Sequence, residues 1–340
     1  MTIQAELASA NPHQRERIPD FFIIGHAKCG TTALWEMLRR HPQIYMPHEK
    51  GVVSKEPWFF SRENPNPQLT GKRSVRFTGR RQMTLDEYLA LFVEAHAGQI
   101  VGEASTSYIW SRTAATRIAE ARPDAKIIAL LREPASYLRS MHMQLVVNHT
   151  ESELDFRKAL SLDEPRREGR EIPHRSYWPQ ALIYSDRVRY VEQLQRYHAV
   201  FPPDQILVLI YDDFRDDNAA TVRTVLRFLG VDDTHAIEVL RANPSNTLRS
   251  ARIAQLSRSL RAGSTPLARV MREAGKGLTT RRMREVLFYP LQRRVLYAKP
   301  PPVDQQLMNE LRHRFKPEVE RLSEYLARDF VELWGYDRLD

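Results

Sequence analysis

The sequence predicts an α/β fold, in which helices flank a central parallel sheet and a helical extension follows at the C-terminal end. Apolar runs without polar alternation, such as KIIALL at 126–131 and ILVLI at 206–210, are typical of strands buried on both faces. Stretches with helical spacing of apolar residues separate these runs. Strands that alternate with helices indicate a parallel sheet with crossover connections.

In the first half of the chain, a turn glycine at position 25 and Pro42 delimit the first strand–loop–helix unit. Residues 61–84 are polar and aperiodic, which favours a functional surface loop. We expect the elements in this order: strand 21–25, helix 31–40, helix 85–96, strand 99–102, helix 112–121, strand 126–131 and helix 135–147.

In the second half, Gly230 is expected to end a helix as its C-cap. The expected order is a charged loop at 163–177, a long helix at 179–200, a strand at 206–210 and a helix at 217–229. The predicted domain organisation is a flexible N-terminal arm at 1–18 and a single domain at 19–340, divided into an α/β core at 19–250 and a helical extension or lid at 251–340.

Composition limits the classes of protein. The 340 residues carry a net charge of +9, which favours anionic ligands, and a single cysteine, Cys29, excludes an internal disulfide or a multi-cysteine zinc site. The polar N-terminus lacks the apolar h-region of a secretory signal. The sequence contains no apolar run of 18 residues, so no membrane span is predicted. We therefore expect a soluble cytoplasmic protein.

The segment GHAKCGTT at 25–32 joins the first strand to the first helix and has the layout of a phosphate-binding loop. Backbone amides of residues 28–32 and the hydroxyls of Thr31 and Thr32 can donate to a phosphate at the helix N-terminus. The P-loop pattern of ATPases places lysine after the second glycine, whereas here Lys28 lies inside the loop. The predicted sheet is therefore P-loop-like, with a departure that points away from a triphosphate.

This G-x-x-K-x-G-T-T segment resembles the 5′-phosphosulfate loop of sulfotransferases that use 3′-phosphoadenosine-5′-phosphosulfate (PAPS). The second half of that family's signature is a strand ending in R-x-P, with serine eight residues after the arginine. Arg132, Pro134 and Ser140 stand at these offsets in LREPASYLRS. An arginine fork and a serine hydroxyl can hold a second, isolated phosphate. Two separate cradles fit the 3′,5′-bisphosphate of PAPS and do not fit a linear triphosphate.

Three further segments strengthen the resemblance, which covers about 20–232. KEPWFF at 55–60 is similar to the K-E-x-x-F-F segment of the heparan-sulfate-sulfotransferase-like branch, in which the glutamate is the proposed base. GEASTSY at 102–108 resembles the family's G-E-x-S-P-x-Y stretch, and the passage from 201 to 231 resembles its strand–Y-E-D-L–helix–FLG passage. The lack of an anchor fits a bacterial cytosolic member.

The resemblance implies that PAPS, leaving as PAP, is the cofactor and that no metal is required. Two departures concern its 3′-phosphate: Tyr137 stands where an arginine is common, and Arg249 is a weak substitute for the R-K-G motif. The implied cofactor-binding residues are His26, Ala27, Lys28, Cys29, Gly30, Thr31, Thr32, Arg132, Ser140, Tyr211 and Arg249.

In-line sulfuryl transfer needs a base for the acceptor hydroxyl and a cation for the leaving phosphate. The resemblance assigns these roles to Glu56 and Lys28, with Lys55 as a helper. His142 is the second candidate for the base, although a packing role on its helix suits it better. Cys29 is expected to be a small buried loop residue, since direct transfer needs no covalent intermediate.

Other functions stay open on the sequence. Asp212 and Asp213 follow an apolar strand, as the acidic residues that hold magnesium do. The alternative function is therefore a Mg-ATP- or GTP-dependent P-loop kinase-like phosphotransferase. A third possibility is a protein that binds an anion without catalysis. In the first interpretation the acceptor is a hydroxyl of a carbohydrate, glycoconjugate or secondary metabolite. The arginine-rich segment 250–300 suits a membrane surface, an anionic acceptor, a helical lid or a homodimer face. No nucleic-acid-binding motif accompanies the charge.

Overall fold

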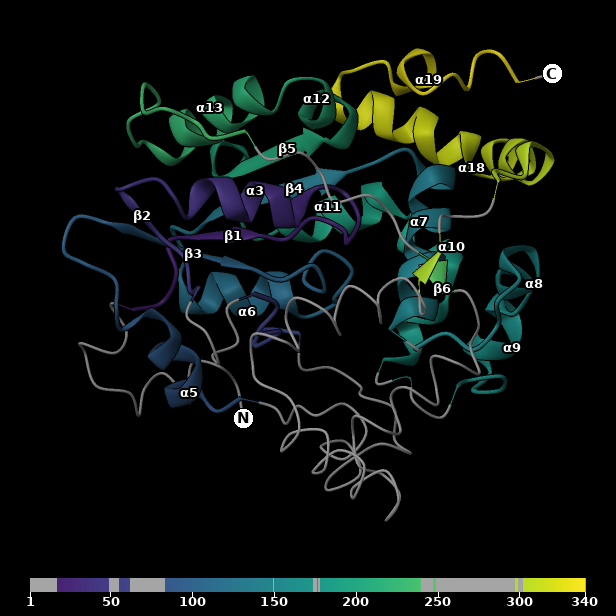
Figure 1. Cartoon of the computed structure of the whole chain (residues 1–340), viewed down its shortest axis with the longest axis horizontal. Helices are drawn as coiled ribbons and strands as arrows, with labels where there is room; N and C mark the ends of the chain where they lie inside the picture. Colours follow the sequence, from purple (N-terminus) through teal and green to yellow (C-terminus); the bar gives the residue numbers. More distant parts are fainter. Residues whose placement is uncertain are drawn as a thin grey trace, which may run out of the picture.

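The computed structural model describes residues 17–48, 55–61, 83–148, 150–173, 176, 178–239, 247–248, 297–298 and 302–339. Within this part of the chain, five strands form one parallel sheet in the order β2-β3-β1-β4-β5 (Figure 1). The strands are β1 (Phe21–Ile23), β2 (Ile44–Tyr45), β3 (Ile100–Ala104), β4 (Lys126–Leu131) and β5 (Ile206–Ile210). The predicted α/β class with a parallel sheet is confirmed.

Helices cover both faces of this sheet. Helix α3 (Thr31–Leu38) packs with α13 (Asn218–Leu229) on one face, and α6 (Ala114–Ala121) packs with α11 (Tyr190–His198) on the other, as right-handed crossovers require. The remaining helices before the extension are α5 (Leu85–Leu89), the 3₁₀ turn Ala90–Phe92, α7 (Pro134–Val147), α8 (Phe156–Ser161), α9 (Asp163–Arg167), α10 (Tyr184–Arg187) and α12 (Tyr211–Asp216).

The central strand β1 defines where a ligand can bind. It pairs with β3 on one side and β4 on the other, so the direction of the chain's crossovers reverses at this strand. In open parallel sheets the crevice beyond the carboxyl ends at such a reversal is the usual ligand site. Gly25 follows β1 against β4, and a Cβ there would lie 2.4 Å from the Leu130 nitrogen, so only glycine lets the loop leave the sheet here.

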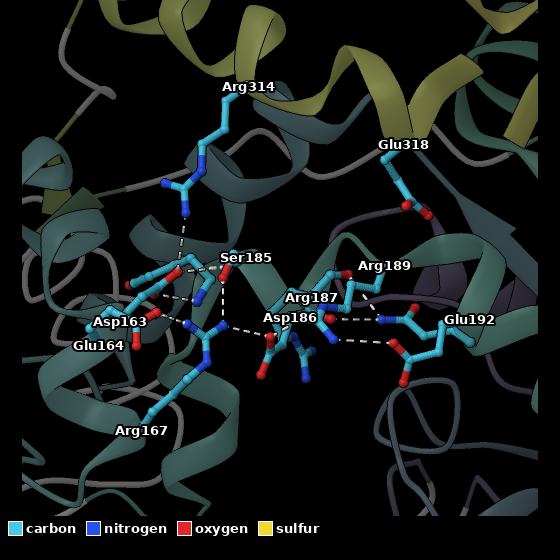
Figure 2. A network of polar contacts seen from close by, with 12 residues as sticks. Asp163, Glu164, Arg167, Ser185, Asp186, Arg187, Arg189, Glu192, Arg314 and Glu318 are labelled. Atoms are coloured by element: carbon cyan, nitrogen blue, oxygen red, sulfur yellow. Dashed lines mark hydrogen bonds and ion pairs between the residues drawn. The ribbon is translucent and has the colours of Figure 1, made fainter. Parts of the chain in front are cut away.

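The prediction of one continuous helix at 179–200 is wrong, because this segment forms three separate elements: a 3₁₀ turn (Pro179–Leu182), α10 and α11. The Asp163 carboxylate accepts hydrogen bonds from the amides of Tyr184 (2.8 Å) and Ser185 (2.9 Å), which starts a new turn. The side chain of Gln193 donates to the carbonyl of Asp186 at 3.0 Å. Figure 2 shows this polar network, in which Arg167 also reaches Ser185 and Asp186.

Three other expectations change. The charged stretch at 163–177, expected as a loop, begins with the short helix α9, whose Asp163 makes the contacts above. Ile18, expected in the N-terminal arm, is 3% exposed and belongs to the hydrophobic core. The helix expected at 85–96 ends earlier, as α5 and a 3₁₀ turn to Phe92. Gly230 caps α13 in the left-handed conformation, as predicted.

The described C-terminal part includes α18 (Gln305–Leu326), which packs against α7 and α11, and α19 (Phe330–Leu333), which packs on α18 (Figure 1). Their apolar residues, including Phe330 and Trp334, join the same core as the sheet. Arg249 and most of segment 250–300 lie outside the described residues. Among the helices that the structure describes, none has the length and apolar character needed to cross a bilayer.

Candidate functional site

The loop between β1 and α3 has the backbone of an anion cradle. Gly30 is the N-cap of α3 at φ 91°, and a Cβ at this position would also meet the Phe214 ring at 2.7 Å. Lys28 holds a left-handed φ of 69°, which is uncommon for a residue with a side chain and is typical of functional loops. The loop therefore presents the free amides of the first turn of α3 at the carboxyl edge of the sheet.

Arg132 joins this loop to the second predicted phosphate motif. Its Nη1 donates to the Lys28 carbonyl at 3.1 Å, and its Nε donates to the Ser136 hydroxyl of α7 at 3.2 Å. The guanidinium also stacks on Tyr211, the first residue of α12, with Cζ 4.6 Å from the ring centroid. The structure thus brings together three segments that the sequence resemblance assigned to one cofactor.

Three cations converge at this junction. The pKa of Lys28 is lowered by burial and by the charge of Arg132, and the pKa of Arg139 is lowered by the same two causes. The Lys28 ammonium donates to Gln144 of α7 at 3.5 Å. A bound anion offsets the repulsion between neighbouring positive groups, so this cluster is suited to phosphate or sulfate.

Ser140 has the hallmark of a ligand donor. It lies on α7, one turn after Ser136, and is 3% exposed. Its hydroxyl has no hydrogen-bond partner within the described part of the chain. A buried hydroxyl left unpaired costs about 1–3 kcal/mol, so a specific orphan of this kind calls for an explanation. A phosphate held beside Arg132 would provide the missing acceptor.

His26 and Cys29 are buried residues of the loop whose side chains face the protein interior. Nδ1 of His26 lies 3.1 Å from the Tyr137 hydroxyl and its Nε2 lies 2.7 Å from the Gln193 side chain, which leaves no ring nitrogen for a ligand. Burial and the charge of Arg187 hold the pKa of His26 well below its usual value, so the ring stays neutral. Burial raises the pKa of Cys29 to about 12, so this thiol is not a nucleophile at neutral pH.

Glu56 is anchored by hydrogen-bond donors from three neighbours. Its Oε1 accepts from Lys55 at 2.6 Å, and its Oε2 accepts from the Trp58 indole at 3.0 Å and from the amide and hydroxyl of Thr106 at 2.8 and 3.0 Å. Both Glu56 (φ 61°) and Trp58 (φ 59°) adopt left-handed backbone conformations. Such strain in non-glycine residues clusters at functional sites, and here it orients one carboxylate.

The stretch that follows β3 holds the KEPWFF segment in place. The amide of Glu56 donates to the Ala104 carbonyl at 2.9 Å, and the amide of Trp58 donates to the Ser105 hydroxyl at 3.2 Å. The amide of Phe60 donates to the Tyr108 hydroxyl at 3.3 Å. The two sequence motifs are therefore one structural unit.

Glu103 lies beneath this unit as a buried carboxyl group. It accepts from the hydroxyls of Tyr88 at 2.9 Å and Tyr108 at 2.7 Å, both on Oε2, while Oε1 has no partner among the described residues. Burial raises the pKa of Glu103 from its ordinary 4.5 to about 7. The group can therefore change its protonation in the neutral range.

We expect the free energy of unfolding of Glu103→Gln to increase relative to that of the natural chain as pH rises from 5 to 8. In the folded protein Glu103 retains a proton up to its pKa of about 7, whereas the unfolded chain releases it near 4.5. The stability contributed by this group is thus complete below 4.5 and is lost as pH rises through 7. Since glutamine does not titrate, the difference in free energy of unfolding should change by up to about 3 kcal/mol over this window. Urea unfolding across the range checks this, and a pH-independent difference would contradict it.

Three tryptophans extend from Glu56 along one wall. Trp58 meets Trp178 edge-to-face at 4.7 Å between ring centroids, and Trp178 meets Trp110 at 5.9 Å. All three are partly exposed, although Trp110 also packs against the hydrophobic core and carries the Arg187 guanidinium 4.4 Å from its ring centroid. This tryptophan wall (Trp58, Trp110 and Trp178) therefore offers aromatic surface next to the candidate base.

His142, the second candidate for the base, lies in a different environment. Its Nε2 lies 2.9 Å from the carbonyl of Glu153, and its ring packs against Phe156 and Tyr184 at 5.2 and 6.1 Å. Burial lowers its pKa below the ordinary value. These contacts describe a packing role between α7 and α8.

A cavity of about 380 Å³ opens beside the loop on the α12 side. Gly30 and Ala33 form one wall, and Tyr211 and Phe214 form another. The other lining residues are 215–219 and Val239. The cavity adjoins the loop through Gly30 and adjoins Arg132 through Tyr211, on which that guanidinium stacks. An aromatic edge next to a phosphate site suits a nucleotide base.

The acidic pair at the end of β5 is occupied by partners from the protein. Asp213 forms a bidentate pair with Arg328 at 2.5 and 2.8 Å, and Asp212 accepts from the Trp334 indole at 3.0 Å. Both aspartates lie in the first turn of α12, whose N-cap is Ile210. Their oxygens serve to attach the C-terminal segment to the strand end.

Sequence reasoning did not single out Ser136, Gln144, Glu103 or the Tyr336 described below. A signal existed for Glu103, since a carboxylate inside an apolar strand demands a partner or a raised pKa. Ser136 and Gln144 lie on the helix after the R-x-P motif and face the loop only because the sheet aligns the two strand ends. That alignment is a property of the fold.

Known proteins match this chain over the same region. A family model described as "Sulfotransferase family" matches residues 19–235. The bifunctional heparan sulfate N-deacetylase/N-sulfotransferase 3 of Homo sapiens is 28% identical over 216 residues, covering 64% of this chain and 23% of that protein. Carbohydrate sulfotransferase 15 of Mus musculus is 26% identical over 260 residues, covering 63% of this chain and 44% of that protein. The chain thus spans less than half the length of these curated relatives.

The fold also matches a solved structure. The crystal structure of a sulfotransferase from Alicyclobacillus acidocaldarius aligns with a TM-score of 0.65 and 27% sequence identity, covering 92% of this chain and 98% of that one. The family model spans well over half of the chain, and its limits enclose the loop, the R-x-P motif and the KEPWFF segment. This chain belongs to the sulfotransferase family of enzymes.

Proposed function

We propose that the protein transfers a sulfuryl group from PAPS to the hydroxyl of a carbohydrate or glycoconjugate acceptor. The observation that carries this proposal is the junction of Lys28, Arg132 and Arg139 at the start of α7. Ser140, whose buried hydroxyl has no partner among the described residues, lies one turn after the Ser136 that Arg132 contacts. Two cradles at neighbouring strand ends suit two separate phosphates on one nucleotide. The chemistry of these donors fits the 5′- and 3′-phosphates of PAPS.

In this proposal the amides at the start of α3, with Thr31 and Thr32, hold the 5′ side of the nucleotide. Arg132 and Ser140 hold the 3′-phosphate, and the cavity beside Tyr211 receives the adenine. PAPS supplies an activated sulfuryl group when it is bound. His26, Ala27 and Cys29 shape the loop and need no direct contact, since His26 and Cys29 are buried beneath it.

The chain's own residues would carry the transfer as follows. Glu56 would accept the proton of the acceptor hydroxyl while the oxygen of that hydroxyl bonds to sulfur. The bond between sulfur and the 5′-phosphate oxygen would break at the same time, with PAP as the leaving group. Lys28 neutralises the charge that develops on that oxygen, which is the step for which a positioned cation is most effective. Lys55, bonded to Glu56 at 2.6 Å, keeps the base oriented.

The alternative, a magnesium-dependent kinase-like phosphotransferase, receives less support from the strand end that it would use. Asp212 and Asp213 are already bonded to Trp334 and Arg328. A loop with lysine inside it also departs from the triphosphate pattern. The donors at this edge of the sheet therefore favour a bisphosphate nucleotide.

A carbohydrate acceptor is supported by the tryptophan wall next to Glu56. Aromatic faces provide apolar contact for a sugar ring, while the base reaches one of its hydroxyls. The similarity to heparan sulfate and carbohydrate sulfotransferases agrees with this class. A screen of glycosides and phenols with labelled PAPS tests it directly: transfer to phenols alone would overturn the carbohydrate assignment.

Calorimetry tests the cofactor with the full chain. We expect PAP to bind in the presence of a chelator, because the proposed site uses only protein donors. ATP is expected to bind more weakly, with or without Mg²⁺, because it lacks a 3′-phosphate. Tight ATP binding that depends on Mg²⁺, without PAP binding, would favour the kinase-like alternative and reject this proposal.

The Ser140→Ala variant sharpens that test. Because the hydroxyl is buried without a partner in the described residues, its removal should leave the unfolding midpoint unchanged or slightly raised. PAP affinity should fall about ten-fold, the value of one hydrogen bond to a charged group. Adenosine 5′-phosphate, which lacks the 3′-phosphate, should bind both proteins equally. Unchanged PAP affinity would remove Ser140 from the site.

A further inference from the structure

We propose that Tyr336, near the C-terminus, positions the 3′-phosphate site by orienting Glu133, the residue after Arg132. This inference rests on the proposed function, because it concerns how that same site selects a 3′-phosphate. Tyr336 would act through Glu133 and touch no ligand itself. It is therefore a positioning residue for cofactor recognition.

The contact between the two residues is buried and direct. The Tyr336 hydroxyl donates to Oε1 of Glu133 at 2.7 Å, although 203 positions separate them in the sequence. Tyr336 is fully buried, and Glu133 is 6% exposed. Burial and the charge of Glu133 raise the pKa of Tyr336, so the hydroxyl stays protonated and continues to donate.

Glu133 in turn fixes the start of α7. It is the N-cap of this helix, and its carboxylate accepts from the amides of Ala135 at 3.0 Å and Ser136 at 2.7 Å. Arg312 of α18 adds a cation 3.7 Å from Oε1. Two groups from the C-terminal segment, a hydroxyl and a guanidinium, therefore meet Oε1 of the carboxylate, which also accepts from the Ala135 amide.

The electrostatic reason for this arrangement would be the phosphate that the proposal places beside Arg132. A free carboxylate beside Arg132 would compete with a phosphate for the guanidinium and would repel the phosphate directly. In the described part of the chain, Arg132 instead donates to the Ser136 hydroxyl and the Lys28 carbonyl. The donors around Glu133 keep its charge turned away, and Arg132 stays directed toward the ligand.

The same segment reaches the site at a second point. The Trp334 indole donates to Asp212 at 3.0 Å, and Asp212 follows Tyr211, on which Arg132 stacks. Trp334 and Tyr336 thus bond to Asp212 and Glu133, the sequence neighbours of Tyr211 and Arg132. The described end of the C-terminal extension is therefore attached next to the proposed nucleotide site.

The test compares Tyr336→Phe with the natural full-length chain, since phenylalanine keeps the buried ring and removes only the donor. By calorimetry, we expect the Kd for PAP to rise three- to ten-fold while the Kd for adenosine 5′-phosphate stays within two-fold. Tyr325→Phe is the matched control, because Tyr325 lies near the end of α18 with its ring against His198. It should change neither affinity.

A merely structural role would give a different result. General loosening of the fold would weaken both ligands together, and that outcome overturns the inference, as does an unchanged PAP affinity in Tyr336→Phe. A second variant, Arg312→Gln, should reproduce the selective loss of PAP affinity, because it also removes positive compensation of Glu133. If the natural chain binds PAP no more tightly than adenosine 5′-phosphate, the cofactor proposal itself fails. A clear preference for PAP that survives Tyr336→Phe rejects only the positioning role.

Discussion

Replacing Glu56 with glutamine is expected to lower kcat for sulfuryl transfer by about 10²–10⁴-fold, the usual contribution of a general base. Glutamine keeps an oxygen that can accept from Trp58 and Thr106, so the segment should stay folded. It cannot take up the acceptor proton. Steady-state kinetics with labelled PAPS measure the effect, and PAP affinity by calorimetry should stay within about three-fold of the natural chain.

The matched control is Glu320→Gln on the exposed face of α18, which removes a carboxylate far from the loop without loss of activity. Near-normal turnover in Glu56→Gln would show that the base is another residue. His142→Ala is then the next variant to measure. The contact of His142 with the Glu153 carbonyl leads us to expect a stability change from that variant rather than a loss of proton transfer.

The parts of the fold that depend on local pattern could be predicted. Strands 126–131 and 206–210 match the predicted limits, because continuous apolar runs bounded by polar residues and proline define them. The meeting of Lys28 with Arg132 was also predictable, since the carboxyl ends of neighbouring parallel strands lie at one edge. Spacing within each motif then indicated which side chains would face a ligand.

The parts that depend on distant contacts could not be predicted. The helical pattern of apolar residues at 179–200 continues through the break. The helix is interrupted because the Asp163 carboxylate accepts from two backbone amides and the Gln193 side chain donates to a backbone carbonyl. The link from Tyr336 to Glu133 likewise joins positions that no local pattern connects. Local propensity yields to such tertiary hydrogen bonds wherever an available carboxylate offers a stronger partner.

Lys28→Ala is expected to give the second large effect, a fall in kcat of about 10²–10³-fold, comparable to removal of one preorganised donor from a developing oxyanion. The lowered pKa of Lys28 shows that burial and Arg132 already disfavour its charge, so the group gains most when negative charge grows next to it. That gain is larger in the transition state than with bound nucleotide. We therefore expect PAP affinity to fall by less than about ten-fold, measured by calorimetry alongside single-turnover rates.

Two further variants separate the position of the charge from its presence. Lys158→Ala removes an exposed lysine on α8 that pairs with Glu153, and it should leave both kcat and PAP affinity unchanged. Lys28→Arg keeps a positive charge in the loop but replaces a compact ammonium with a broad, planar fork, so it should recover nucleotide binding better than turnover. Equal losses of kcat and PAP affinity in Lys28→Ala would instead mean that Lys28 holds the nucleotide uniformly, and stabilisation of the leaving group would then have to come from Arg132 or the amides of α3.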